Sequence, residues 1–388
     1  MKKKLLFLLD RVRSFSAGTV IAVSALAVVV LLFAVILTVT GIENGEIGHA
    51  VGAEKTAVPT TAAETPRLKI SYEMVTPLPA IGAADTKPDG TFTLTLCGKI
   101  PYISILSNMN SDDAERVFAP IATELYADEN LLLSASKMPD YLPGVLKQTG
   151  IDIVAVCPDE QGAGAATEAL LTQNGLRVCE KATGENAMKT KTVVLNGVSS
   201  LFISCSEETL NGKQTEGTER EQHTAGIAES IRNARNNGVA FVAVTVFLDP
   251  DGTTAVTEQQ KKLVMSLCAL GADLVICEKE GCLTAPEWVD VTDAASMQTR
   301  RALAVYSAGM LLPEKENSIA VSYLLHLNIE YHRQSIRYAG IEYTPVYSDA
   351  ENGYEIHVSE TEPANNAALS EKIQEMIDLL ENSPAARR

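Results

Sequence analysis

One unit occurs three times along the chain and restricts the possible folds more than any other feature: an amphipathic helical pattern, a glycine and a short apolar run. In the clearest copy, Thr257 and Gln260 have the spacing of a capping box, and the helical pattern stops at Gly271. The apolar run that follows, Asp273 to Ile276, is typical of a strand buried on both faces. The glycines of the other two copies are Gly150 and Gly238. Three such units predict right-handed crossovers and a largely parallel sheet in an α/β fold.

The part of the chain after Pro313 has a different pattern, because strand-like runs follow one another there without helices between them. These runs are Ser318 to Asn328, Ser335 to Thr344 and Tyr354 to Val358. We expect them to form an antiparallel portion that closes the sheet or adds a second layer. Earlier in the chain, Asn196 and Gly197 give the strongest hairpin signal of the sequence.

The loops after the predicted strands are the place to look for a ligand site, since parallel sheets bind ligands beyond the carboxyl ends of their strands. These loops read CPDEQGAG from Cys157, FLDPDGTT from Phe247 and CEKEGCLT from Cys277. All three contain carboxylates and none contains histidine. Any site at this edge is therefore built from acidic and thiol side chains.

The order of segments from about Thr91 to about Tyr343 resembles the CapA family, proteins of capsule and poly-γ-glutamate biosynthesis. Members of that family usually begin with a strand ending in Gly-Asp, whereas Gly98 is followed here by Lys99. Their Tyr-Ser-Leu-Gly-Asn-Phe corresponds to the segment from Tyr306 to Leu311. The resemblance implies an α/β mixed-sheet layered sandwich of the calcineurin-like metallophosphoesterase type.

The polar motifs of the family are changed at each strand end. Its Asn-Asn-His falls near Pro158, Asp159 and Glu160, its His-Trp-Gly at Phe247 to Asp249, and its Gly-His-His-Pro-His at Cys277 to Gly281. A two-metal phosphoesterase needs converging imidazoles and carboxylates to hold its ions and generate hydroxide. We therefore expect no family-type metal centre, no resident cofactor and no catalytic residues. The candidate residues of the vestigial cleft are Lys99, Asp159, Glu160, Asp249, Asp251, Cys277, Glu278, Glu280, Cys282 and Ser307.

Other chemistry of the same residues stays open. The loop carboxylates supply oxygen ligands of the kind that a divalent cation such as calcium takes, although acidic loops are more often solvated turns. Cys97, Cys157, Cys277 and Cys282 fall near strand ends and allow a thiolate zinc site, and Cys277 and Cys282 allow a disulfide. The burial typical of free cysteine favours thiols that form neither. Ser307 has no histidine and acid placed to activate it. We expect His326 and His332 to be ordinary surface or half-buried histidines.

The amino-terminal part predicts a membrane anchor. Ala17 to Val39 is almost entirely apolar and, as a helix, about 35 Å long, enough for a bilayer core of about 30 Å. Residues 1–13 hold five basic side chains and one acid, so the positive-inside rule keeps them in the cytoplasm and exports the rest. Because the whole chain carries −17, these residues at +4 leave −21 for residues 14–388. That charge repels nucleic acid and anionic polymer alike, unless a local basic patch overrides the net field.

The predicted organisation follows the chain in five parts. They are a cytoplasmic basic tail (1–13), a transmembrane anchor (14–42), a flexible tether (43–90) with a possible strand from Leu68 to Val75, the CapA-like domain (91–360) and a carboxyl-terminal amphipathic helix and tail (361–388). The helix carries Leu369, Ile373, Met376, Ile377 and Leu380 on one face, behind a possible cap at Asn366. We expect it to dock on the domain or to meet a partner.

These features favour a membrane-anchored, extracytoplasmic protein that acts as a non-catalytic binding or assembly component in capsule or poly-γ-glutamate biosynthesis. Its expected partners are the membrane, through Ala17 to Val39, and polymer-synthesis membrane proteins or an anionic cell-surface polymer. The alternative is an active hydrolase or transferase with a metal centre rebuilt from Asp, Glu and Cys. The polymer connection comes from the resemblance alone.

Overall fold

A computed structural model describes most of the chain after residue 86. The described residues are 70–72, 87–101, 104–125, 127–134, 137–158, 163–181, 192–207, 210, 219–248, 255–279, 282–292, 299–315, 318–332, 335–350, 353–359, 367–383 and 385. The predicted basic tail, membrane anchor and most of the tether lie outside them. Within the described part, no helix combines the length and the apolarity that crossing a bilayer requires.

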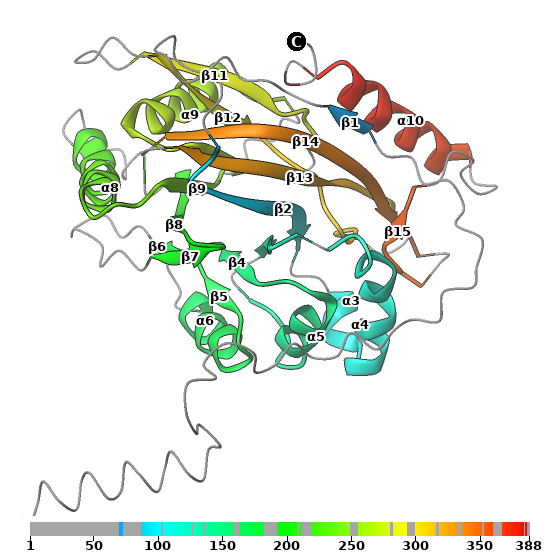
Figure 1. Ribbon diagram of the computed structural model, residues 1–388. Helices are drawn as coiled ribbons and strands as arrows, with labels where there is room; N and C mark the ends of the chain where they lie inside the picture. The colour runs from blue at the N-terminus through cyan, green and yellow to red at the C-terminus, as the bar shows by residue number, and fades with distance from the viewer. Residues whose placement is uncertain are drawn as a thin grey trace, which may run out of the picture. The chain divides into compact units, whose positions relative to one another are not determined.

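The first sheet has eight strands and is mixed (Figure 1). Its parallel half consists of β2 (Gly90–Ile100), β3 (Glu129–Ser134), β4 (Ile153–Val156) and β5 (Arg177–Val178). Its antiparallel half consists of β13 (Ala320–His332), β14 (Ser335–Ser348), β1 (Ile70–Tyr72) and β15 (His357–Val358). The prediction of an antiparallel portion after Pro313 is confirmed, and β1 lies within the segment predicted as a possible strand.

The second sheet has seven strands and holds the remaining helix–strand units. Its parallel strands are β6 (Glu180–Lys181), β8 (Val198–Ser206), β9 (Phe241–Phe247), β10 (Leu274–Glu278) and β12 (Thr299–Val305). The antiparallel additions are β7 (Val193–Leu195), beside β8, and β11 (Glu287–Thr292), beside β12. Asn196 and Gly197 join β7 to β8 with positive φ angles of 45° and 85°, so the predicted hairpin is confirmed.

The two sheets pack face to face with helices outside, which gives a four-layer sandwich (Figure 1). Between the sheets the rings of Phe92 on β2 and Phe241 on β9 meet edge to face, with centroids 5.4 Å apart. The outer face of the first sheet packs on α3 (Ser104–Asn108), α4 (Ser111–Phe118), the 3₁₀ turn η1 (Ala119–Ile121), α5 (Leu142–Thr149) and α6 (Ala163–Gln173). The outer face of the second packs on α8 (Glu219–Asn236) and α9 (Glu258–Leu270). The predicted mixed-sheet layered α/β sandwich is confirmed.

The α9–β10 unit shows how the sequence sets these elements. The Thr257 hydroxyl accepts a hydrogen bond from the Gln260 amide, and the Gln260 side chain accepts one from the Thr257 amide, so the predicted capping box is present. At the other end Gly271 adopts φ +120°, the left-handed conformation that ends a helix at low cost. The chain then enters β10, whose five residues are all buried.

The carboxyl-terminal helix α10 (Ala367–Glu381) docks on the sandwich rather than standing free. Leu369, Ile373, Met376 and Leu380 are buried, and Ile377 is half-buried. Beyond the helix, the Ser383 hydroxyl donates a hydrogen bond to the Pro286 carbonyl oxygen. The Trp288 ring nitrogen donates one to the carbonyl oxygen of Ala385. The apolar face of α10 is therefore used within the chain. The possible cap Asn366 lies outside the described residues.

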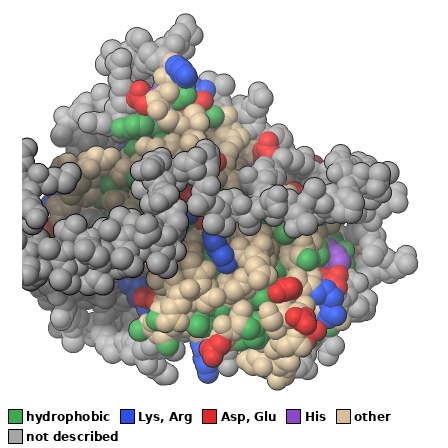
Figure 2. All heavy atoms as spheres, turned by 60° about the horizontal axis from the view of Figure 1, so that its bottom comes forward, with side chains coloured by type: hydrophobic (Ala, Val, Ile, Leu, Met, Phe, Trp, Pro, Cys, Tyr) green, Lys and Arg blue, Asp and Glu red, His purple; other side chains and the backbone are tan. Residues whose placement is uncertain are grey.

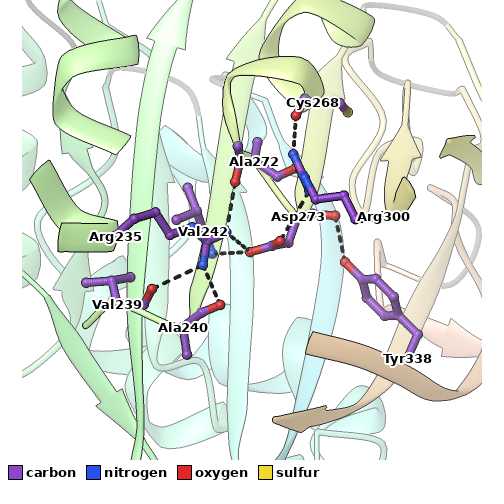
Figure 3. Close-up of polar contacts among 10 residues, drawn as sticks. Arg235, Val239, Ala240, Val242, Cys268, Ala272, Asp273, Arg300 and Tyr338 are labelled. Carbon is purple, nitrogen blue, oxygen red and sulfur yellow. Dashed lines mark hydrogen bonds and ion pairs between the residues drawn. The ribbon is translucent and has the colours of Figure 1, made fainter. Parts of the chain in front are cut away.

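A buried ionic network fixes the amino end of β10 (Figure 3). The Asp273 carboxylate contacts Arg235 of α8 at 2.5 Å and Arg300 of β12 at 3.4 Å, and it accepts the amide of Val242 on β9 at 2.8 Å. The Tyr338 hydroxyl, from the first sheet, donates to the backbone carbonyl of Asp273. One aspartate thus links two strands, a helix and the facing sheet, at the end of β10 opposite the candidate cleft.

Charges of both signs are mixed on the surface that is drawn for the described residues. On the face in Figure 2, basic and acidic side chains stand beside one another and alternate with hydrophobic ones. Among the described residues, the Arg116 guanidinium forms ion pairs with the carboxylates of Asp113 and Glu355. No single-sign field is therefore visible among the described residues of that face.

Candidate functional site

The carboxyl ends of β2 and β10 meet, although these strands belong to different sheets. The Lys99 ammonium lies 2.9 Å from Oε1 of Glu278, and the two side chains are only 16% and 8% exposed. Lys99 is the residue that follows Gly98 at the end of β2, and Glu278 is the last residue of β10. Two of the ten candidate residues are therefore a buried ion pair that joins the sheets.

A bulge in β2 turns Lys99 toward the second sheet. Leu96 pairs with Leu131 of β3, but Lys99 pairs with Leu133, so three steps on β2 match two on β3. Leu96 faces the core between the sheets, and Ile100 lies in the outer core. Residues four apart in a regular strand would share a face, so the extra residue shifts the alternation and puts Lys99 on the inner side.

The same alternation places Glu278 and Cys277 on opposite faces of β10. Ile276 belongs to the core between the sheets, whereas Cys277 belongs to the core beneath α8 and α9. Glu278 thus points to Lys99, and the Cys277 thiol does not face the predicted cleft. Burial raises the pKa of Cys277 well above its usual value, and the nearby Glu207 and Glu278 carboxylates raise it further.

Glu207 and Lys279 belong to the same region but were missing from the sequence-based candidates. Glu207 follows β8 directly and is 8% exposed, and its carboxylate is close enough to affect Cys277. Lys279 follows β10, is 3% exposed and donates a hydrogen bond of 3.2 Å to Oε1 of Gln260. The hairpin signal at Asn196 and Gly197 could have found Glu207, because the strand after that turn ends in a fourth strand-end loop.

Ser307 has a structural role. Its hydroxyl donates to the carbonyl oxygen of Cys282 at 2.8 Å and accepts the amide of Gly309 at 3.2 Å. Its backbone exchanges hydrogen bonds with Thr284. These contacts hold the segment after β12 against the loop after β10. The sequence favoured such a structural role for Ser307 over that of a nucleophile.

The cysteines form no disulfide. Each of the seven lies within the described residues, and neither Cys277 and Cys282 nor any other two form a disulfide. The Cys282 side chain is 8% exposed and lies close enough to Tyr323 to affect the pKa of its phenol. The absence of a Cys277–Cys282 disulfide and the burial of both thiols agree with the alternative that the sequence favoured.

Two histidines of the antiparallel half differ from each other. His326 is buried, with Nδ1 2.9 Å from the Thr95 hydroxyl and Nε2 3.1 Å from the Thr344 hydroxyl, so the expectation of a surface or half-buried residue was wrong for it. The reason is its central position on β13 between β2 and β14. His332, at the end of β13, is half-buried as expected and lies 3.2 Å from Glu330.

Five of the candidate carboxylates lie outside the described residues: Asp159, Glu160, Asp249, Asp251 and Glu280. Within the described part of the chain, no group of three His, Cys, Asp or Glu side chains is arranged to hold a metal ion. Of the described candidates, Lys99 and Glu278 form an ion pair with each other.

Two solved structures align with about three quarters of this chain. A calcineurin-like phosphoesterase from Bacillus subtilis, YfkN, aligns with 13% identity and a TM-score of 0.38, covering 74% of this chain and 97% of that one. The sulfate thiohydrolase SoxB from Thermus thermophilus aligns with 10% identity and a TM-score of 0.36, covering 76% of this chain and 61% of the other. No curated protein matches the sequence.

The sequence itself gives the family. The family model described as "Bacterial capsule synthesis protein PGA_cap" matches residues 119–313, just over half of the 388 residues. The matched region runs from η1 through the second sheet to the segment after β12, and so includes Glu278 and Ser307. The chain belongs to the PGA_cap family of bacterial capsule synthesis proteins.

Proposed function

We propose that this protein is a membrane-anchored, extracytoplasmic component of capsule or poly-γ-glutamate biosynthesis that binds or assembles without catalysing a reaction. Membership of the capsule synthesis family supports the process. The apolar segment from Ala17 to Val39, with basic residues before it, supports the anchor and its orientation. The partners that fit are polymer-synthesis membrane proteins or an anionic polymer at the cell surface.

The ion pair of Lys99 and Glu278 is the observation that supports the non-catalytic part of the proposal. A dication about 4 Å from the ammonium would be repelled by about 8 kcal/mol at an effective dielectric constant of about 20. The carboxylate that could attract the ion is already 2.9 Å from Lys99. An ion pair at this place supports a site that holds no metal, since a two-metal hydrolase needs ligands free to bind its ions.

Metal analysis of the purified full-length protein tests this function. We expect less than stoichiometric zinc, manganese or iron, and no hydrolysis of phosphomonoesters, phosphodiesters or γ-glutamyl peptides after any of these ions is added. Glu278→Ala and Asp249→Ala serve as controls. A stoichiometric metal that is lost in both variants, with activity lost alongside it, would establish the rebuilt hydrolase or transferase instead.

The biosynthetic role needs a cellular measurement. Deleting the gene in the native host should lower the amount of cell-associated capsular polymer, and the wild-type chain should restore it. Asp249→Ala should restore it equally, because no reaction depends on that carboxylate. A reporter fused after Arg388 should be active only outside the cytoplasm, and activity in the cytoplasm would refute the proposed orientation.

A further inference from the structure

We propose that strand β1 turns the cleft end of the sandwich, where β2 and β10 end, toward the membrane. The strand leads the predicted tether onto the edge of the first sheet from that end. The cleft end then faces the bilayer and the proposed membrane partners rather than the surrounding medium. This inference rests on the membrane anchor of the proposed function.

The register of the first sheet places the start of β1 near the cleft end. Ile70 pairs with Tyr343 of β14, which pairs with Leu325 of β13. Leu325 in turn pairs with Leu96 of β2. Ile70 therefore lies level with Leu96, three residues before Lys99 at the end of β2.

The direction of β1 shows from which side the chain arrives. β1 is antiparallel to β14, β14 to β13, and β13 to β2, so β1 runs against β2. The strand starts at Ile70 on the cleft side, and its last residue, Tyr72, lies nearer the amino end of β2. The chain therefore enters β1 from the cleft end. A tether that led directly into β2 would arrive at Gly90, at the opposite end.

A second strand on the same edge fixes the point of entry. β15 pairs with Tyr347 and Val346 of β14, and the Ser359 amide donates to the Pro345 carbonyl oxygen at 2.9 Å. These contacts occupy the part of the β14 edge that lies at the cleft end. An incoming strand has to pair further along, and β1 begins at the Tyr343 pair, two residues past Pro345.

The length of the predicted tether lets this entry point set the orientation. Between the predicted anchor, which ends at residue 42, and β1 lie 27 residues (43–69), whereas 47 residues (43–89) precede β2. As the flexible tether that the sequence predicts, the shorter segment has a root-mean-square span of about 30 Å. A folded domain of about 270 residues is roughly 45 Å across. Because the tether is shorter on average than the domain is wide, the end at which it enters stays nearer to the bilayer.

Energy transfer to labelled lipids tests the orientation in the full-length protein, reconstituted in vesicles. The parent protein carries Cys157→Ala and one new cysteine at an exposed position. This is Lys137→Cys, after β3 on the cleft side, or Gln173→Cys, before β5 on the opposite side. A membrane-impermeant maleimide dye labels only domains outside the vesicles. We expect clearly higher transfer to the lipid from position 137 than from position 173.

A release variant shows whether β1 is the cause. Ile70→Gly, Ser71→Pro and Tyr72→Gly keep the length of the chain but remove the pairing with β14. The difference between the two dye positions should then disappear. The variant should melt within about 4 °C of the parent, because a three-residue edge strand contributes little to the domain.

A disulfide trap tests the pairing itself. Ser71→Cys and Glu342→Cys lie opposite each other in the register and should form a disulfide, whereas Ser71→Cys with Glu330→Cys should not. Equal transfer from both dye positions in the parent, a difference that survives release, or no disulfide in the first pair would each overturn the inference. A protein that washes off the vesicles would refute the anchor, and the inference with it.

Discussion

Gly98 lies so close to Gly309 that a β-carbon on Gly98 would be 2.7 Å from the Gly309 carbonyl oxygen and 2.3 Å from the Ser322 hydroxyl. Gly309 itself adopts φ +81°, and a β-carbon there would be 2.4 Å from the Val321 carbonyl oxygen. Gly309 lies within the residues that the family model matches. Three backbone segments approach one another closely at this point, so neither glycine leaves room for a side chain.

Gly98→Ala should therefore lower the free energy of unfolding by about 2–4 kcal/mol, because a backbone carbonyl would have to move. Chemical denaturation measures the change. Gly226→Ala is the matched control: Gly226 is half-buried in α8 with nothing within 4 Å of an added β-carbon, so alanine should be neutral or stabilise by about 0.5–1 kcal/mol. Equal effects at both sites would contradict the packing argument.

Asp273→Asn should be among the most destabilising single changes in the domain, by about 3–5 kcal/mol. It removes the charge shared by Arg235 and Arg300 while both guanidinium groups stay partly buried. Asp152→Asn is the control, since Asp152 has the equivalent place before β4 but pairs with the more exposed Lys147. We expect about 1 kcal/mol there by denaturant titration. A loss at Asp273 no larger than at Asp152 would refute the central role of this network.

Much of the fold could be predicted because its local signals agree with the final packing. The capping box at Thr257, the Asn196–Gly197 turn and the glycines after each helix all have the predicted conformations. The amphipathic face of α10 predicted a docked helix or a partner, and the structure gives the first. These features depend on neighbours in sequence, so the sequence alone is sufficient to recognise them.

The candidate site could be predicted only in part, because its geometry depends on contacts between distant segments. The sequence indicated that Lys99 replaces an acidic residue, but the bulge that turns it inward and its pairing with Glu278 follow from the register of two sheets. The sequence placed Cys277 at the cleft because this residue lies near a predicted strand end. A position near a strand end does not by itself say on which face of the sheet the side chain lies. The alternation of side chains along β10 puts it on the other face.

Thiol labelling of the folded protein should select Cys157. It is half-buried, whereas five of the other cysteines lie in the cores, where burial raises their pKa values. The five are Cys97, Cys179, Cys205, Cys268 and Cys277. Mass spectrometry after brief treatment with iodoacetamide should find Cys157 modified first, and all seven only after unfolding. Early modification of Cys205 would show that the outer core opens more easily than its packing indicates.

The buried thiols also predict a loss of stability at alkaline pH. Burial raises the pKa of Cys205 and of Cys268 from 9.0 to about 12, so the folded protein keeps protons that the unfolded chain releases above pH 9. The free energy of unfolding should therefore fall as pH rises from about 9 to 12, by up to about 1.4 kcal/mol per pH unit for each such thiol.

Cys205→Ala separates this effect from general alkaline damage. Denaturant titrations at several pH values should show a shallower decline for Cys205→Ala, by about 1.4 kcal/mol per pH unit, even though the variant starts less stable at neutral pH because of the cavity. Cys157→Ala should decline as steeply as the wild type, since its thiol is outside the buried set. If Cys205→Ala and the wild type lose stability in parallel, the Cys205 thiol does not contribute to the alkaline transition.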